Sequence, residues 1–259
     1  MNIVVCVKYV PDAQSERSFE SDNTTERESV DGLLSELDEY AVEEALAIAE
    51  AGDAEVTVLT MGPDPASAAI KKALQMGAHK GIHVNDAAIA GSDAIGTSRV
   101  LAAAIDKIGS VDLVLTGLGS TDGVMSVVPA MLAERLGLPQ VTFASELTVQ
   151  GGVVRIRRDG DVASETVEAS LPAVVSVTDQ INEPRYPSFK GIMAAKKKPV
   201  ETWSLADLGV DAGEVGLGAA WTSVVSIEQR PPRSQGEIVT DEGQGGAALA
   251  EFLTSRKFA

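Results

Sequence analysis

Val111-Asp112-Leu113-Val114-Leu115 is an apolar run that leads into the small, polar loop Thr116-Gly117-Leu118-Gly119-Ser120-Thr121-Asp122-Gly123. A short apolar run bounded by turn residues is typical of a strand that is buried on both faces of a parallel sheet. Apolar residues at helical spacing then predict a helix from about Val127 to Leu136. The whole stretch predicts one strand–loop–helix unit, the building block of an α/β fold.

Three similar units precede this one. Their strands are predicted at residues 2–7, 56–59 and 82–84, and their helices after Ser35 and at residues 66–76 and 92–108. The polar residues 11–33 predict a loop or a small hairpin over the sheet. Four such units predict a parallel sheet with right-handed crossovers and helices on both faces. Ligands bind at the carboxyl ends of such strands, here Val7-Lys8, Thr60-Met61, Val84-Asn85 and Thr116-Gly117.

The pattern changes after residue 140. Residues 141–148, 152–158 and 163–169 predict the short strands of an antiparallel extension, and residues 173–177 predict another buried strand. Residues 209–246 have little periodicity, and residues 247–258 predict a short final helix. We therefore expect an α/β domain over residues 1–205, which includes a hairpin at about 141–169, and a C-terminal arm over residues 206–259 that packs on another surface.

Composition narrows the class of protein. The formal net charge is −17, whereas nucleic-acid binding requires a basic surface that neutralises phosphates. Cys6 is the single cysteine, and its apolar surroundings in the sequence predict a small buried hydrophobe rather than a reactive thiol. The apolar runs are too short for a membrane span, and the N-terminus lacks the pattern of a signal peptide. We expect a soluble, cytoplasmic protein.

The loop from Gly117 to Gly123 is the first candidate site. A small-residue loop that opens a helix presents backbone N–H groups and a positive dipole end, and both favour a phosphate. The loop has neither a phosphate-binding lysine nor the glycine pattern of a dinucleotide fingerprint, which disfavours a kinase or a hydrolase. An ordinary strand-to-helix turn explains the composition equally well.

Other polar residues give weaker signals. Ser35-Glu36-Leu37-Asp38 has the spacing of a capping box, although Asp38 would also suit an adenine amino group or a ribose hydroxyl. His79 and His83 are separated by glycine and have no ligand cluster around them, so we expect no metal site. No nucleophile motif accompanies the two histidines, and covalent catalysis is not expected.

Residues 182–199 form the most unusual segment. Pro184 and Pro187 predict a loop, followed by a helix from Gly191 to Lys198 with lysines in its last turn. Phe189 and Met193 are four residues apart, so they can share an apolar face. Phe189 is either an exposed docking anchor or part of the protein's own core, and composition alone leaves both open.

Asn182-Glu183-Pro184-Arg185-Tyr186 and Ile192-Met193-Ala194-Ala195-Lys196-Lys197-Lys198 closely resemble the recognition loop of electron-transfer flavoprotein β subunits. The resemblance extends along essentially the whole chain. Other matching stretches are Val7–Asp12, Asp38–Leu46, Ala73–Ala78, Leu138–Gln140, Leu171–Val175 and Asp207–Val210.

The resemblance implies a Rossmann-like fold of the adenine-nucleotide α-hydrolase type and a heterodimer with an α subunit that holds most of the FAD site. The β subunit would bind a structural AMP, have no catalytic residues of its own, and dock acyl-CoA dehydrogenases of fatty acid β-oxidation. Electrons would pass on to a membrane quinone oxidoreductase.

By position, the implied AMP site comprises Cys6, Ser35, Glu36, Leu37, Asp38, Met61, Asp122, Gly123, Val124, Met125, Ser126, Val127 and Val128. The implied docking loop, residues 180–199, offers Arg185, Tyr186, Phe189, Ile192, Met193, Lys196, Lys197 and Lys198. Asp159 falls where relatives carry an acid that pairs with the α subunit.

Two departures from the family pattern bear on this site. Many relatives carry Asn-Pro where this chain has Ser35-Glu36, and a more polar stretch where it has residues 124–129. Backbone amides could still bind a phosphate there. Two alternatives to the AMP-binding β subunit stay open, and one is a bifurcating flavoprotein, in which a second FAD replaces AMP. Another is a stand-alone adenine-nucleotide sensor that forms a homo-oligomer.

Overall fold

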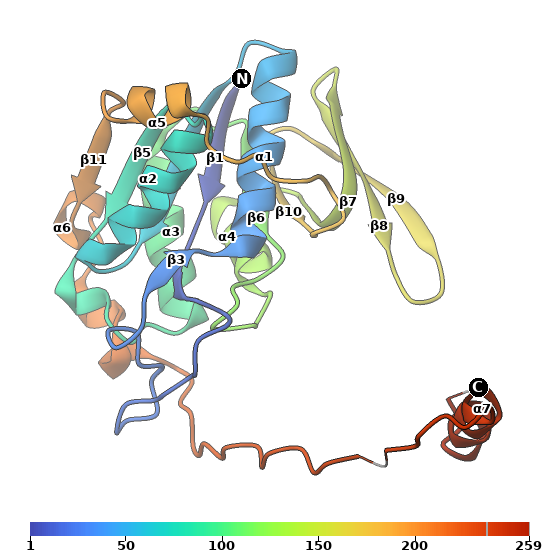
Figure 1. Ribbon diagram of the computed structural model, residues 1–259. Coiled ribbons are helices and arrows are strands. Elements are labelled where there is room, and N and C mark those ends of the chain that lie inside the picture. The colour runs from blue at the N-terminus through green and yellow to red at the C-terminus, as the bar shows by residue number, and fades with distance from the viewer. Residues whose placement is uncertain (237, 259) are drawn as a thin grey trace. The chain divides into compact units, whose positions relative to one another are not determined.

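The computed structural model describes residues 1–236 and 238–258. The chain forms two compact units, Met1–Val225 and Ser226–Ala259. The first unit contains the sheet and its covering helices (Figure 1). Among the described residues, no helix combines the length and the apolar character that crossing a membrane would require.

A single nine-stranded sheet forms the centre of the first unit, in the order β11-β5-β4-β1-β6-β10-β7-β8-β9. The strands from β11 to β7 pair in parallel, and β7, β8 and β9 pair antiparallel. Their bounds are β1 Asn2–Cys6, β4 Glu55–Met61, β5 Lys80–Val84, β6 Leu113–Gly117, β7 Gln140–Gln150, β8 Val153–Asp159, β9 Ser164–Ser170, β10 Ala173–Val177 and β11 Val200–Trp203. The predicted parallel sheet with an antiparallel extension is confirmed, and the extension continues the same sheet.

Strand β11 was not predicted, because its sequence follows the irregular, lysine-rich segment. It pairs along β5, with Val200 opposite Gly81 and Trp203 opposite Val84. Most of its residues are exposed, as at the edge of a sheet. A short edge strand lacks the continuous apolar run that marks a central strand, so periodicity alone does not reveal it.

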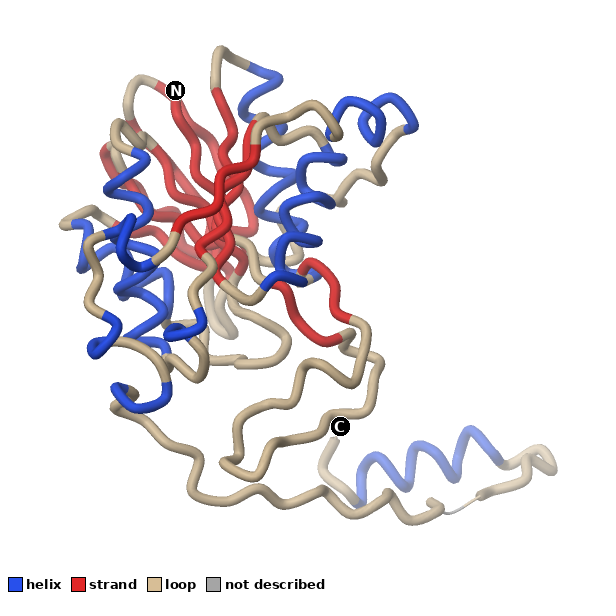
Figure 2. The backbone as a smooth tube through the Cα atoms, turned by 90° about the vertical axis from the view of Figure 1, so that its left-hand side faces the viewer, coloured by secondary structure: helices blue, strands red, loops and turns tan. Residues whose placement is uncertain are grey.

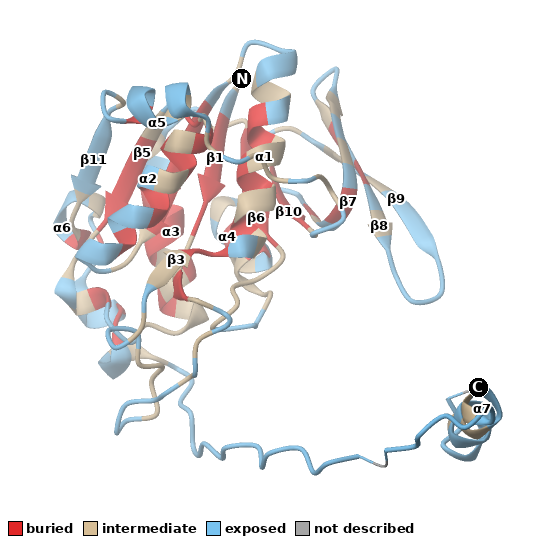
Figure 3. Cartoon of the chain, viewed as in Figure 1, coloured by how far each residue is buried: buried red, intermediate tan, exposed pale blue. Residues whose placement is uncertain are grey.

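Alternate residues of each central strand face opposite layers of helices. In β1, Ile3 and Val5 belong to one buried cluster, and Val4 and Cys6 belong to the other. The first cluster includes residues of α1 (Glu36–Ala51), α2 (Ser67–Met76) and α5 (Phe189–Ala195). The second includes residues of α3 (Ala94–Ile108), α4 (Val128–Leu136) and α6 (Leu205–Leu208). Figure 2 shows the strands between these two groups of helices, and Figure 3 shows that the central strands are buried.

Residues 9–34 form the small hairpin that the sequence allowed. Strands β2 (Tyr9–Pro11) and β3 (Gly32–Leu34) pair antiparallel, and a bridge between Phe19 and Thr25 closes the part between them. Short 3-10 helices lie at η1 Asp64–Ala66, η2 Ala87–Ile89, η3 Ala212–Glu214 and η4 Leu217–Ala219.

The order of the strands reverses at β1, which lies between β4 and β6. The chain leaves β1 toward β4 on one side and later returns to place β6 on the other side. The carboxyl ends of β1 and β6 are neighbours there, with Cys6 opposite Thr116. In open α/β sheets such a switch point leaves a crevice where ligands bind.

The first unit extends beyond the boundary expected after residue 205. Val210 and Val215 are 9% and 4% exposed and pack in the second core cluster, so residues 206–225 belong with the body of the protein. The second unit, Ser226–Ala259, contains the helix α7 (Gly245–Ser255), which has no buried side chain. The final helix was therefore predicted correctly, although its bounds differ.

A pair of truncations tests this boundary. A chain that ends at Val225 should melt close to the full-length chain, whereas one that ends at residue 205 loses most of α6 and the burial of Val210 and Val215. At about 1.5–3 kcal/mol for each fully buried valine, its melting temperature should fall by several degrees or more. Circular dichroism melts provide the comparison, and equal melting of the two truncated chains would show that residues 206–225 do not belong to the core.

Candidate functional site

The carboxylate of Asp38 joins the ends of the two strands at the switch point. Asp38 lies in the first turn of α1 and is 6% exposed. The backbone N–H of Lys8, just after β1, donates to Oδ2 at 2.8 Å, and the backbone amide of Gly117, at the end of β6, also hydrogen-bonds this carboxylate. Asp38 thus holds α1, β1 and β6 together at the expected ligand crevice.

Burial controls the ionisation of the groups around this carboxylate. Burial raises the pKa of Asp38 to about 7, although the hydrogen bonds from Lys8 and Gly117 act in the opposite direction. Burial, with a contribution from the nearby Asp38, raises the pKa of the Cys6 thiol to about 12. Cys6 is therefore a buried, protonated thiol, as its sequence context predicted.

The close approach of α1 to β6 requires a glycine at position 117. A Cβ on Gly117 would lie 2.6 Å from Asp38 Oδ1 and 2.7 Å from the carbonyl oxygen of Leu37. Both distances are shorter than side-chain contacts allow, so a larger residue would push the helix away from the strand.

The loop between β6 and α4 contains backbone amides without protein partners. The N–H of Gly123 donates to Ser120 Oγ at 3.1 Å, and that of Val124 donates to the Ser120 carbonyl oxygen. The amides of residues 125–127 have no partner among the described residues. φ is 55° at Ser126 and −101° at Val127, an alternation found in anion-binding nests. These amides directly precede the nine-residue helix α4, whose N-terminus adds a positive dipole end.

Val124 gives this loop an unusual backbone. Its φ is 51°, a left-handed conformation that is rare for a β-branched residue, and its side chain is 73% exposed. Strained conformations of this kind concentrate at functional sites because the surrounding structure has to enforce them.

Lys8 supplies the basic group that the loop itself lacks. Its Nζ lies 2.8 Å from Asp122 Oδ1, and Arg27 Nη2 lies 2.7 Å from Asp122 Oδ2. Burial would raise the pKa of Asp122, but the charge of Lys8 and hydrogen bonds from both cations lower it overall. Neither cation was predicted, although Lys8 stands at a strand end where ligands were expected.

The capping box predicted at Ser35 and Asp38 is wrong. Ser35 makes no side-chain hydrogen bond to the helix, and its Oγ is buried without a partner among the described residues. The Asp38 side chain instead binds the two strand ends. Three other positions of the predicted AMP site lie near the same ends of the strands. Glu36 and Leu37 begin α1, and Met61 ends β4.

The two histidines have structural partners in the backbone. His79 Nδ1 accepts from the N–H of Val56 at 3.0 Å, and His83 Nε2 lies 2.9 Å from the carbonyl oxygen of Gly62. No group of three or more His, Cys, Asp or Glu side chains suited to a metal ion occurs in the part of the chain that the structure describes.

The segment that was predicted to dock a partner is fixed to α1 by Arg185. Its guanidinium binds Glu43, with Nε 2.8 Å from Oε2, and also binds both carboxylate oxygens of Glu50. Asn182 donates to the Tyr40 carbonyl oxygen. The side chain of Arg185 is therefore used within the chain, where it positions the loop.

Helix α5 continues the same segment and packs closely on α2. It spans Phe189–Ala195, two residues earlier than predicted, because Ser188 Oγ caps it by accepting from the N–H of Gly191 at 3.0 Å. A Cβ on Gly191 would lie 2.4 Å from the Gln75 carbonyl oxygen, so glycine permits this close contact.

The lysines do not occupy the last turn of α5 as predicted, because the helix ends before them. Lys198 Nζ instead donates to the carbonyl oxygens of Leu74 and Gly77, at 2.9 and 3.0 Å. It thereby satisfies carbonyls at the C-terminal end of α2. Lys196 and Lys197 remain exposed.

Large apolar side chains cover the outer surface of this segment. Tyr186 is 92% exposed, Phe189 81% and Met193 48%, and Ile192 lies between the last two in sequence. Exposure of this extent excludes the alternative in which Phe189 packs in the protein's own core. The four residues form an exposed apolar patch, the predicted docking patch, on a segment held by Arg185 and Lys198.

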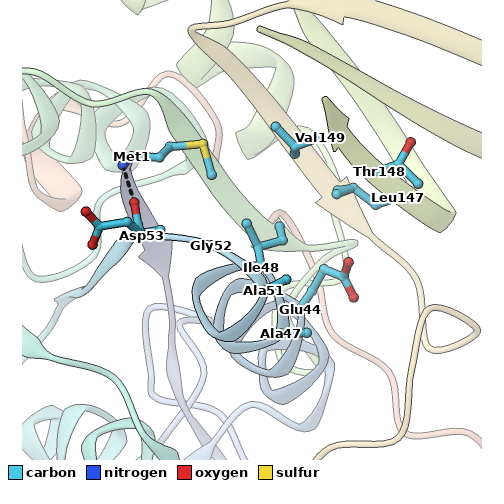
Figure 4. Close-up of a pocket in the computed structure, with 11 residues that line it drawn as sticks. Met1, Glu44, Ala47, Ile48, Ala51, Gly52, Asp53, Leu147, Thr148 and Val149 are labelled. Atoms are coloured by element: carbon cyan, nitrogen blue, oxygen red, sulfur yellow. Dashed lines mark hydrogen bonds between the residues drawn. The ribbon is translucent and has the colours of Figure 1, made fainter. Parts of the chain in front are cut away.

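Two further features lie away from these residues. Asp159, at the end of β8, accepts from Arg157 Nε at 2.9 Å and from Ser145 Oγ at 2.5 Å, so it is already engaged within the hairpin. A hollow of about 480 Å³ lies between the C-terminal end of α1 and β7, and Ile48 and Leu147 are among its lining residues (Figure 4). Met1 also lines it, which places the hollow at the end of the sheet opposite to Lys8.

Fold and site together define an α/β domain with a polar crevice at its switch point and a separate exposed apolar patch. The family model of the electron transfer flavoprotein domain matches residues 22–208. Electron transfer flavoprotein subunit beta of Mycobacterium tuberculosis is 49% identical over 262 residues, which cover 99% of this chain and 98% of that protein. The corresponding subunit of Clostridium acetobutylicum is 36% identical, over 96% of this chain and 95% of that protein.

A third relative is the caffeyl-CoA reductase-Etf complex subunit CarD of Acetobacterium woodii, 35% identical over 93% of this chain and 92% of that protein. The chain belongs to the electron transfer flavoprotein family and is related to its β subunits over nearly its full length.

Replacement of Asp38 by asparagine tests the buried carboxylate. Because the folded-state pKa of about 7 exceeds the unfolded value of about 3.9, the folded state binds an extra proton between these pH values. Stability from this group is present below about pH 4 and is lost as pH rises toward 7. Asparagine does not titrate, so Asp38→Asn lacks this loss of stability. The melting temperature of the variant minus that of wild type should therefore rise between pH 5 and pH 8. Parallel pH profiles would contradict a raised pKa.

Proposed function

We propose that this chain is the β subunit of a heterodimeric electron-transfer flavoprotein that binds a structural AMP and docks acyl-CoA dehydrogenases. The α subunit would hold most of the FAD site, and electrons would pass from that FAD to a membrane quinone oxidoreductase. The observation that supports the docking role is the exposed patch around Phe189, which ion pairs of Arg185 fix to α1 and hydrogen bonds of Lys198 fix to the end of α2.

The AMP proposal rests on the residues at the switch point. The partnerless amides of residues 125–127 and the ammonium of Lys8 suit a phosphate, and the partnerless Oγ of Ser35 suits a polar atom of the adenosine. AMP would act structurally, by filling the crevice between α1, β1 and β6. Bound FAD would supply the redox chemistry. This chain would bind the nucleotide, orient it and exclude water from the crevice.

Docking would use a rigid surface. Arg185 and Lys198 hold the segment before a partner arrives, so little conformational entropy is lost when Phe189 is buried. Lys196 and Lys197 are exposed beside the patch and would act as rim charges that speed association at low salt. Lys198 contributes less to that steering, because its ammonium binds the end of α2.

The second unit of the chain would pack on the α subunit. Helix α7 carries Leu249 and Phe252, which are 58% and 45% exposed, and the unit has too few apolar residues for a core of its own. An apolar helix face without a core is typical of a segment that is buried in an assembly. We expect the complex to reside in the cytoplasm.

A second candidate function is that of a bifurcating flavoprotein with a second FAD in place of AMP. One relative, at 35% identity, is a subunit of a caffeyl-CoA reductase-Etf complex. A stand-alone nucleotide sensor is disfavoured by the family, because relatives of 49% identity are named as subunits of an electron transfer flavoprotein.

Cofactor stoichiometry separates these alternatives. The heterodimer should release one FAD and one AMP on denaturation, measured by absorbance and mass spectrometry. Two FAD molecules and no AMP would identify the bifurcating form. Expressed alone, this chain should be colourless, and a yellow, stoichiometrically flavinylated single chain would refute the division of roles.

Truncation of Phe189 tests the docking surface. Burial of the ring in a partner is worth roughly 1.5–3 kcal/mol, so Phe189→Ala should weaken docking about 10- to 100-fold. The apparent affinity comes from electron transfer, titrated between a cognate acyl-CoA dehydrogenase and the heterodimer. Cofactor content and melting temperature should stay unchanged, because the ring is 81% exposed.

Val162→Ala is the matched control for this experiment. Val162 is 99% exposed on the turn between β8 and β9, so its truncation also removes an exposed apolar side chain, but away from the patch. Docking that is unchanged in Phe189→Ala, or equally weakened in both variants, would refute the role of Phe189.

A further inference from the structure

Two basic side chains from different parts of the chain converge on one carboxylate at the candidate nucleotide site. Lys8 follows β1, and Arg27 lies in the hairpin between β2 and β3. Lys8 Nζ binds Asp122 Oδ1, and Arg27 reaches Asp122 Oδ2 through Nη2 at 2.7 Å and Nε at 3.2 Å. Each contact joins residues that are more than ninety positions apart, so local sequence pattern could not predict this pairing.

The charges in this cluster do not balance. Two cations bind the single carboxylate of Asp122, and the nearby carboxylate of Asp38, whose pKa burial raises to about 7, neutralises only part of the remaining positive charge. The Asp122 side chain is fully covered, whereas those of Lys8 and Arg27 are 42% and 40% exposed. Both cations are therefore accessible to an anion from solvent, while the carboxylate is not.

Hydrogen-bond donors without partners lie in the same loop as Asp122. The amides of residues 125–127 follow it directly, and Thr121 Oγ1, which precedes it, is buried without a partner. The ammonium of Lys8 is close to this backbone, since a Cβ on Gly123 would lie 3.9 Å from it. Phosphates bind where positively charged side chains and free backbone amides meet. Both are present here, because Lys8 and Arg27 contact the loop that contains the free amides.

We propose that Lys8 and Arg27 bind the phosphate of the adenine nucleotide, and that Asp122 holds both side chains in position before the ligand arrives. The inference rests on the proposed nucleotide site and assigns its phosphate contacts. Arg27 would close the hairpin of residues 12–31 over the phosphate, because the guanidinium contacts the loop from that hairpin.

A purely structural role is the alternative explanation of the same contacts. In that case the ion pairs only fasten the hairpin to the loop. The two explanations differ for a ligand that lacks the phosphate: a structural defect weakens adenosine and AMP alike, whereas loss of a phosphate contact weakens AMP alone.

The test is calorimetric titration of AMP and of adenosine into the heterodimer after its bound nucleotide has been removed. Lys8→Met and Arg27→Met should each weaken AMP by about 10- to 100-fold, the usual effect of losing a hydrogen bond to a charged group. Adenosine should bind as it does to wild type. Arg17→Met is the control, because Arg17 lies on the same hairpin and its one hydrogen-bond partner within the described residues is the carbonyl oxygen of Pro11.

Three results would overturn the proposal. Equal weakening of AMP and adenosine would assign Lys8 and Arg27 a structural role. Unchanged AMP affinity in both variants would refute the phosphate contacts and leave the AMP site itself intact. If wild type bound neither ligand, the proposed nucleotide site would be wrong, and the assignment of its phosphate contacts would be wrong with it.

Discussion

The buried carboxylate of Asp38 is the interaction on which the arrangement of this protein depends. A carboxylate is costly to bury, and this one is retained because it accepts hydrogen bonds from the backbone ends of β1 and β6. These amides lie at the switch point, where the order of the strands reverses. Without the Asp38 carboxylate they would have to find other hydrogen-bond partners. The start of α1, the end of β1 and the loop after β6 are thereby held in one place.

The candidate nucleotide site is a consequence of that constraint. Helix α1 approaches β6 closely enough to require Gly117, and in the loop that follows Val124 and Ser126 take left-handed conformations. The turn leaves backbone amides without partners. Lys8 lies close to this loop because it directly follows β1, the strand whose end Asp38 binds.

The sequence predicted the features that depend on local pattern. Alternating or continuous apolar runs located the central strands. Composition left open whether Phe189 is exposed or buried, and only the resemblance to the recognition loop favoured an exposed anchor. What it could not show are pairings between distant residues, such as Arg27 with Asp122 and Arg185 with Glu43. The capping box predicted for Asp38 was also wrong. An acidic residue in the first turn of a helix suits a capping box as well as a link between strand ends, so the sequence pattern does not distinguish the two roles.

Helix α1 connects the two proposed functional surfaces. Its first turn supplies Asp38 to the nucleotide site, and its later turns supply Glu43 and Glu50 to Arg185 of the docking segment. Sixteen residues of helix span about 24 Å and bend little, so the two surfaces keep a fixed separation. A nucleotide that secures the start of α1 would also secure the base of the docking patch. A structural nucleotide can therefore support docking without any contact with the docking partner.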